Sequence, residues 1–318
     1  MGAAVKMKAF VRLMCLFWFC SFNASATAGV TSEKQTLVHD GLTRSYLVHV
    51  PQNVAQHGGL VPLVLVLHGG GGNGENAERM TGFSQEADEE GFIVVYPEGT
   101  GRFGKMLTWN AGHCCGYAMK NRIDDVSFID ALIDKLTRDY PVDPRRIYVT
   151  GMSNGGLMAH RLGVELSSRF AAIAPVVASV FGDETAPSQP VSALMINGLL
   201  DKHIPVEGGV SGGIFPDAWD GTPMKPFEAQ GAFWARADGC MSAPEREDRK
   251  TYSLTRYRCP EGKNVELYLI KDNGHAWPGG QQGSRMGDKP STALNATDVI
   301  WSFFKVHTRA QERRSTHG

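Results

Sequence analysis

The sequence predicts an α/β fold in which a mostly parallel central sheet carries helices on both faces. Continuous apolar runs, which are typical of strands buried on both faces, recur along the chain. They lie at residues 61–67, 92–96, 147–150, 172–177, 193–196 and 265–270. Amphipathic segments with helical periodicity separate most of them. This alternation favours parallel strands joined by crossover helices.

The remaining elements follow from local signals. Asp40-Gly41 interrupts the alternating segment 36–49, which predicts a β-hairpin. Asp124-Asp125 is expected to cap a helix that ends at Asp139. Residues 98–123 show no periodicity and are expected to form a long functional loop. Further helices are expected at residues 75–90, 154–166, 227–237 and 293–306.

Composition bounds the class of protein. The chain has 318 residues, is 42% hydrophobic and 20% charged, and has a net charge of −1. This composition is ample for a large core. Because no basic stripe is present, nucleic acid is not an expected partner.

The N-terminus has the pattern of a secretory signal peptide. Lys6, Lys8 and Arg12 precede the apolar stretch 13–22, and Ala26-Thr27-Ala28 resembles a cleavage site. The apolar stretch is too short to span a bilayer. We therefore expect residues 1–28 to be removed and 29–318 to form a single catalytic domain. The mature protein is expected to be secreted, in the periplasm or outside the cell, and not to be membrane-bound.

Four cysteines remain after such a cleavage, and an even number in an exported protein suggests disulfides. Cys240 and Cys259 flank a polar segment, and we expect them to pair. A closed loop of roughly 20 residues contributes about 3 kcal/mol on a chain-entropy estimate. Cys114 and Cys115 allow two interpretations, a vicinal disulfide or two buried thiols. No metal-binding spacing is present, so no metal site is expected.

Residues 151–156 read Gly-Met-Ser-Asn-Gly-Gly and follow the apolar run 147–150. A strand that enters Gly-x-Ser-x-Gly and leaves as a helix forms the nucleophile elbow of an α/β-hydrolase fold. The tight turn places its serine in a strained backbone conformation. It lifts the hydroxyl of Ser153 above the sheet edge, where a base can activate it.

The other catalytic groups follow in the chain order that this fold requires. Asp201 and His275 lie downstream of Ser153, each after a predicted strand. We expect Ser153 to be the nucleophile, His275 the general base and Asp201 the residue that orients the imidazole. Asp183 and Glu207 are alternative acids, and His203 is an alternative base. Asp124 and Asp125 are interpreted as helix caps rather than catalytic groups.

A glycine run follows the strand at 61–67. We expect the backbone N–H of Asn154 to be one oxyanion donor and that of Gly70, or else Gly71, to be the second. Trp109, Trp277 and His68 adjoin these loops and are expected to bind substrate. The run could instead hold phosphate, but it lacks the Lys-Ser/Thr and the Gly-x-Gly-x-x-Gly spacing of such sites.

The combined motifs resemble a known family. They are His68-Gly69-Gly70-Gly71-Gly72, Trp109-Asn110-Ala111-Gly112, Cys114-Cys115-Gly116, Asp124-Asp125-Val126, Gly151-Met152-Ser153-Asn154-Gly155-Gly156, Asp201, Ile204-Pro205-Val206, Gly208-Gly209 and Gly274-His275-Ala276-Trp277-Pro278-Gly279-Gly280. Over residues 35–305 the chain resembles the secreted esterases grouped as poly(3-hydroxybutyrate) depolymerase-like and carbohydrate-esterase feruloyl esterases. The resemblance implies a serine carboxylesterase without a cofactor that uses Ser153, Asp201 and His275. Many members have Cys where this chain has Gly70.

The resemblance leaves the ester open. Hydroxycinnamoyl esters of plant cell-wall polysaccharides, or other soluble short acyl esters, are the expected substrates, and hydroxyalkanoate oligomers or poly(3-hydroxybutyrate) are the alternative. The chain ends soon after its last predicted helix without a Ser/Thr-rich linker, which favours soluble esters. A prolyl-type peptidase would need a larger insertion, and a non-catalytic hydrolase-fold protein would not need the triad.

Overall fold

The computed structural model describes residues 1–2, 31–211, 218–240 and 243–309, so the expected signal peptide lies almost wholly outside the described residues. A 10-stranded sheet runs through the molecule in the order β1-β2-β4-β3-β5-β6-β7-β10-β9-β8. The strands are β1 (Glu33–His39), β2 (Leu42–His49), β3 (Val61–Leu67), β4 (Ile93–Pro97), β5 (Val142–Met152), β6 (Ala172–Val176), β7 (Ser192–Gly198), β8 (Glu245–Asp248), β9 (Tyr252–Arg258) and β10 (Asn264–Ile270). From β4 to β10 the neighbouring strands are parallel, and the pairs at both edges are antiparallel. The predicted α/β-hydrolase fold class is confirmed.

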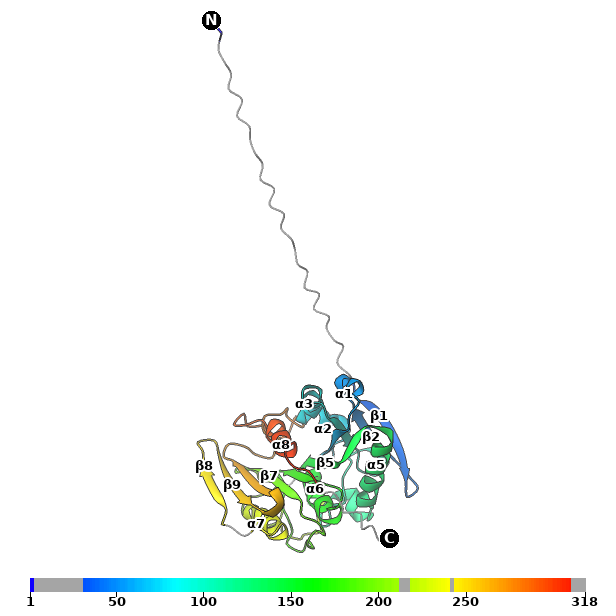
Figure 1. Cartoon of the computed structure of the whole chain (residues 1–318). Helices are drawn as coiled ribbons and strands as arrows, with labels where there is room; N and C mark the ends of the chain where they lie inside the picture. The colour runs from blue at the N-terminus through cyan, green and yellow to red at the C-terminus, as the bar shows by residue number, and fades with distance from the viewer. Residues whose placement is uncertain (3–30, 212–217, 241–242, 310–318) are drawn as a thin grey trace, which may run out of the picture.

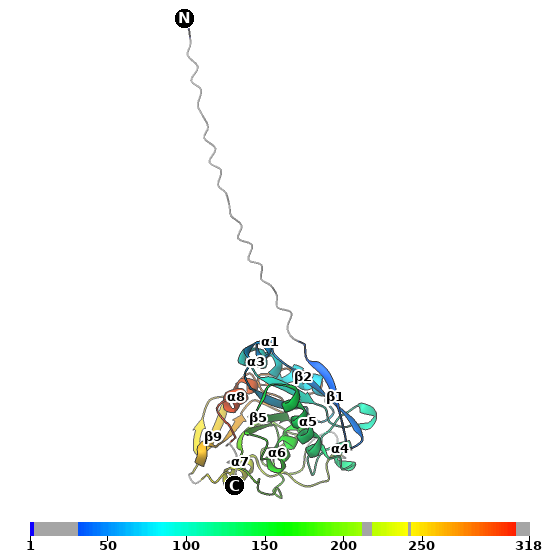
Figure 2. The same ribbon diagram turned by 45° about the vertical axis from the view of Figure 1, so that its right-hand side comes forward.

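The helices cover both faces of this sheet (Figures 1 and 2). They are α1 (Gln52–His57), α2 (Gly74–Thr81), α3 (Phe83–Glu90), α4 (Gly116–Lys120), α5 (Asp125–Asp139), α6 (Asn154–Glu165), α7 (Phe227–Ala237) and α8 (Ala296–Phe304), with short 3₁₀ turns at Arg102–Gly104 and Pro260–Gly262. Side chains of α5, α6 and α7 share one buried cluster. Those of α2, α3 and α8 share the other.

Strand β3 explains why its sequence is apolar without interruption. Leu63 and Leu65 belong to the cluster under α5, α6 and α7, while Val64 and Val66 belong to the opposite cluster. All four side chains are fully buried. Because successive side chains on a strand point to opposite faces, a strand covered on both sides needs apolar residues at every position.

Most predicted boundaries agree with the structure, and the differences have local causes. The predicted hairpin forms, with Asp40 and Gly41 both at positive φ, as a tight two-residue turn requires. The helix predicted over 75–90 is broken at Gly82, whose φ of 70° ends α2 before α3 begins. The 15-residue helix α5 starts after Asp124, whose side chain accepts a hydrogen bond from Ser127 N as a cap.

Both cysteine pairs form disulfides in the structure. Cys240 is joined to Cys259, as expected from the sequence. Cys114 is joined to Cys115, and the peptide bond between them is cis. Of the two interpretations of this pair, the structure contains the vicinal disulfide. In the described part of the chain, no helix is both long and apolar enough to cross a membrane.

Candidate active site

The predicted site residues lie on loops at one edge of the sheet. The loop that follows β3 carries the glycine run, and Ser153 follows β5 directly. Asp201 follows β7, and His275 follows β10. These four strands run parallel within one sheet, so their carboxyl ends meet at the same edge.

Ser153 occupies the turn between β5 and α6 in a conformation that residues with a side chain rarely adopt. Its φ is 58° and its ψ is −121°. A Cβ on Gly155 would lie 2.4 Å from the carbonyl oxygen of Leu67, and one on Gly151 would lie 2.6 Å from that of Gly155. Only glycine therefore fits on either side of the serine, which accounts for the spacing of the motif.

Ser153, His275 and Asp201 form a continuous hydrogen-bonded chain. His275 Nε2 lies 2.8 Å from Ser153 Oγ, and His275 Nδ1 lies 2.8 Å from Asp201 Oδ2. Asp201 Oδ1 accepts hydrogen bonds from the backbone N–H groups of His203 and Ile204, which fixes the carboxylate. This is the arrangement in which an imidazole can take a proton from a serine hydroxyl.

His203, the alternative base, and Asp183, an alternative acid, make other contacts. The His203 ring lies against that of His275, with 4.7 Å between centroids. Burial, together with the neighbouring His275, lowers the pKa of His203. Asp183 forms an ion pair with His113 instead.

Asp288 is part of the site although no sequence motif marks it. Its Oδ2 accepts a hydrogen bond from the backbone N–H of His275 at 2.7 Å. A Cβ on Gly274 would lie only 2.2 Å from that oxygen, so the glycine before His275 makes room for the carboxylate. Asp288 therefore fixes the backbone that carries the imidazole.

Two backbone N–H groups beside Ser153 have no acceptor among the described residues, namely those of Asn154 and Gly70. The N–H of Gly71 is excluded as an alternative because it donates to Leu107 O at 2.7 Å. Free N–H groups in this position are the groups that an oxyanion hole requires. The geometry thus favours Gly70 over Gly71.

The segment 107–109 connects to both of these positions. Leu107 O holds the N–H of Gly71, next to Gly70. The Asn154 side chain accepts from Trp109 N at 2.7 Å and donates to Trp109 O at 3.0 Å. One stretch of loop therefore fixes the backbone on both sides of the proposed oxyanion hole.

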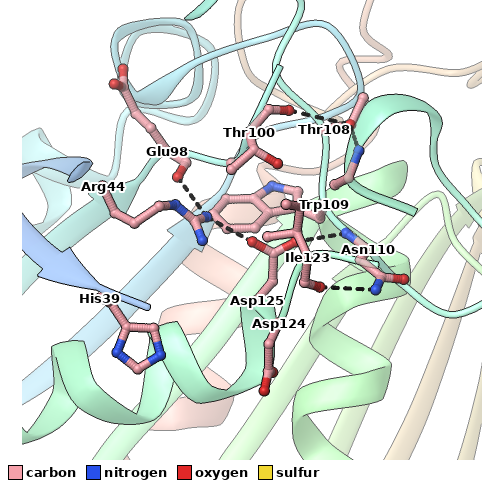
Figure 3. Close-up of polar contacts among 12 residues, drawn as sticks. His39, Arg44, Glu98, Thr100, Thr108, Trp109, Asn110, Ile123, Asp124 and Asp125 are labelled. Atoms are coloured by element: carbon pink, nitrogen blue, oxygen red, sulfur yellow. Dashed lines mark hydrogen bonds and ion pairs between the residues drawn. The ribbon is translucent and has the colours of Figure 1, made fainter. Parts of the chain in front are cut away.

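A buried ion pair holds this loop against the sheet (Figure 3). Arg44 Nη2 donates to Asp125 Oδ1 at 2.7 Å, and Asp125 Oδ2 accepts from Asn110 N at 2.8 Å. The side chains of Arg44 and Asp125 are 3% and 0% exposed. Burial raises the pKa of Asp125, although the Arg44 charge opposes that shift. The sequence suggested that Asp125 is a helix cap. In the structure it instead anchors the loop.

Replacing Asn154 with alanine keeps its backbone N–H but removes both hydrogen bonds to Trp109. We expect kcat to fall about 10- to 100-fold with a small change in KM, because an oxyanion donor displaced by a fraction of an ångström loses most of its effect. Steady-state kinetics on a soluble ester measures this.

The matched control for Asn154→Ala is Tyr148→Phe. This change also removes a buried side-chain hydrogen bond to backbone, from Tyr148 to His307 O, and Tyr148 lines neither of the two cavities that border Ser153. We expect it to leave kcat within about twofold, since stability rather than positioning is affected. Equal losses of kcat in the two variants would contradict a positioning role for the Asn154 side chain.

Two cavities border Ser153 and His275. The glycine-loop cavity, of about 550 Å³, is lined by residues 69–73 together with Lys34, Asn76 and Glu98 among others. The Trp219 cavity, of about 580 Å³, is lined by Tyr117, Trp219, Ile204 and Met286 among others. Both volumes are in the range of small-ligand sites.

Three residues that were expected to bind substrate are buried, so the prediction for them is corrected. Trp109 is 0% exposed and donates through Nε1 to His68 O, and Trp277 is 1% exposed and donates to Thr297 Oγ1. His68 is fully buried, accepts from Gly99 N, and has its pKa lowered to about 4 by burial. None of the three lines either cavity. They are core residues beneath the site loops, and the aromatic side chains that line the Trp219 cavity are Tyr117 and Trp219 instead.

The described residues contain no group of three or more His, Cys, Asp or Glu side chains that could hold a metal ion.

Comparison with known proteins identifies the class first. Matches to esterases in sequence and in fold show that this protein is a carboxylic ester hydrolase. Residues 44–202 match the family model described as esterase PHB depolymerase. The chain therefore belongs to the esterase PHB depolymerase family.

Curated relatives span several named activities. The putative esterase NocK of Nocardia uniformis subsp. tsuyamanensis is 32% identical over 82% of this chain and 78% of its own length. Feruloyl esterase B of Piromyces equi is 30% identical over 70% of this chain but only 41% of its own length. The poly(3-hydroxybutyrate) depolymerase of Ralstonia pickettii is 26% identical over 91% of this chain and 64% of its own length.

Solved structures show the same fold. The acetyl xylan esterase from Aspergillus awamori superposes with a TM-score of 0.57 and 14% identity, over 86% of this chain and 99% of that one. A thermostable esterase superposes with a TM-score of 0.52 and 14% identity, over 87% of this chain and 63% of that one. At these identities the likeness concerns the fold alone.

Proposed function

We propose that this protein is a secreted serine carboxylesterase that hydrolyses hydroxycinnamoyl or other soluble short acyl esters through an acyl-enzyme intermediate. The observation that carries the serine mechanism is the unbroken chain from Ser153 Oγ through His275 to the buried carboxylate of Asp201, with 2.8 Å at both links. The signal-like sequence 1–28 and the Cys240–Cys259 disulfide support secretion.

The proposed reaction has two half-reactions. Ser153 Oγ attacks the ester carbonyl carbon while its proton passes to His275 Nε2, and the carbonyl oxygen becomes an oxyanion. The N–H groups of Asn154 and Gly70 donate to that oxyanion. His275 then gives the proton to the alcohol oxygen as the carbon–oxygen bond breaks. Water repeats the sequence on the acyl-enzyme and releases the acid. Asp201 stabilises the imidazolium in each half.

The choice of substrate rests on the lining of the Trp219 cavity. Tyr117 and Trp219 supply aromatic surface beside Ser153, with Ile204 and Met286. Such a pocket suits a small or aromatic acyl group. The relative named feruloyl esterase B points to the same class of ester.

Trp219→Ala is expected to lower kcat/KM for methyl ferulate about two- to tenfold more than for methyl acetate, because stacked ring contacts contribute about 0.5–1.5 kcal/mol. Trp219→Phe, which keeps a ring, should restore most of the difference. Equal effects of Trp219→Ala on both esters would argue against aromatic acyl binding in this cavity.

The alternative, hydrolysis of hydroxyalkanoate oligomers or polymer, is favoured by one observation. Phe103 and Met286 are 86% and 90% exposed, and Met286 lines the Trp219 cavity. Exposed apolar side chains of this kind can contact an apolar polymer surface.

A substrate panel separates the two candidates. It consists of methyl ferulate, p-nitrophenyl butyrate, hydroxybutyrate trimer and a polymer film. We expect turnover of the soluble esters and little or no clearing of the film. Rapid clearing of the film without release of ferulate would overturn this choice in favour of the depolymerase.

A further inference from the structure

The Trp219 cavity carries a concentration of positive charge. Arg102, Lys105 and Lys120 line it, and they come from two separate segments, the loop after β4 and the end of α4. Among the described residues, no carboxylate forms an ion pair with any of the three. The guanidinium of Arg102 lies over the Phe103 ring, 5.2 Å from its centroid, and this neutral ring attracts the cation without neutralising its charge.

The other cavity beside Ser153 differs in this respect. It shares Lys105 and Asp288 with the Trp219 cavity, and its other cation, Lys34, forms an ion pair with Glu98 at 3.0 Å. In the Trp219 cavity the one carboxylate among the described lining residues is Asp288, which is engaged with the backbone N–H of His275. The imidazoles of His203 and His275 also face this space. A chain with a net charge of −1 thus places three cations, against a single carboxylate, next to its proposed nucleophile.

We propose that the Trp219 cavity is a subsite for a carboxylate that one half of the ester substrate carries at a distance from the ester bond. The apolar and aromatic lining, Tyr117 and Trp219 among it, holds the body of that half, and the cations hold its charged end. This inference rests on the proposed function and narrows its substrate class to anionic esters.

The test compares matched esters that differ only in charge. Methyl 4-carboxycinnamate is paired with methyl 4-carbamoylcinnamate for the acyl half, and 4-carboxybenzyl acetate with 4-carbamoylbenzyl acetate for the alcohol half. The readout is the ratio of kcat/KM within each pair at low salt. We expect a ratio on the order of ten in favour of the carboxylate in at least one pair. It should fall toward one at about 0.5 M salt, where the Debye length is only about 4 Å.

Variants assign the effect to the cavity. Arg102→Gln, Lys105→Gln and Lys120→Gln should each lower the ratio by a factor of roughly two, and their combination should bring it near one. Lys250→Gln, which removes an exposed cation between β8 and β9, should leave the ratio unchanged. Thermal melting checks that the triple variant is folded, and the single variants carry the test if it is not.

The outcomes separate the subsite from the proposed function. Hydrolysis of the carbamoyl esters with ratios near one in both pairs would overturn the subsite and leave the esterase proposal standing. A ratio that the three charge substitutions do not change would also overturn it. If none of the four esters is hydrolysed, the subsite is overturned, and the result counts against the proposed function as well.

Discussion

Ser153→Ala is expected to lower kcat on any soluble ester substrate by on the order of 10⁴- to 10⁶-fold, because the members of a catalytic triad act as a unit. The hydroxyl that it removes lies 2.8 Å from His275 Nε2 and has no substitute in that position. His275→Ala should cost a similar factor, and the double variant should cost little more than either. Single-turnover and steady-state rates on p-nitrophenyl butyrate measure all three.

Ser192→Ala is the matched control for this loss. Ser192 is fully buried at the start of β7, at the other end of that strand from Asp201, and its hydroxyl accepts a hydrogen bond from Asn264 N. We expect it to leave kcat within about threefold, since it affects only packing and one hydrogen bond. Retention of a tenth of the activity by Ser153→Ala would show that the nucleophile lies elsewhere.

Asp125→Ala is expected to lower the free energy of unfolding by about 3–5 kcal/mol, since removal of one partner leaves a buried charge uncompensated. Arg44 is 3% exposed, and its Nε already has no hydrogen-bond partner among the described residues. The variant also frees Asn110 N from its acceptor. Urea unfolding of the purified protein gives the value. Removing both charges, in Arg44→Met with Asp125→Ala, should cost less than the sum of the single changes.

Asp130→Ala, on the same helix, is the control for Asp125→Ala because it removes a partly exposed ion pair instead of a buried one. Asp130 pairs with Arg169 at 2.6 Å, but both side chains are about a third exposed. Its loss should cost no more than about 1 kcal/mol, because water screens a surface pair. Similar costs for Asp125→Ala and Asp130→Ala would contradict the anchoring role of the buried pair.

The parts of the fold that the sequence predicts are those with strong local signals. The apolar run of β3 reflects burial on both faces, and Asp40-Gly41 fits a turn that needs positive φ at both positions. Strand β8 (Glu245–Asp248) escaped prediction because all four of its residues are charged. It forms at the sheet edge through pairing with β9, where Glu245 meets Arg258 across the strands. Tertiary pairing of this kind leaves no apolar pattern in the sequence.

The residues of the proposed site likewise include some that the sequence predicts and some that it does not. Ser153, Asp201 and His275 follow strands and stand in a fixed chain order, so motif and order suffice to propose them. The direction of a loop side chain is not encoded by its position next to a motif. Trp109 and Trp277 adjoin site loops yet point into the core, while Trp219 lines the cavity from a segment without a motif. Asp288 acts through backbone contact with His275, which no spacing in the sequence reveals.

Labelling with a fluorophosphonate, followed by peptide mapping, tests the central claim most directly. A fluorophosphonate reacts with a serine that a neighbouring base activates far faster than with an ordinary serine. We predict one adduct per protein, on the peptide that contains Ser153, with esterase activity lost in proportion to labelling. An unlabelled Ser153, an adduct on another serine, or full activity in the fully labelled protein would contradict the account.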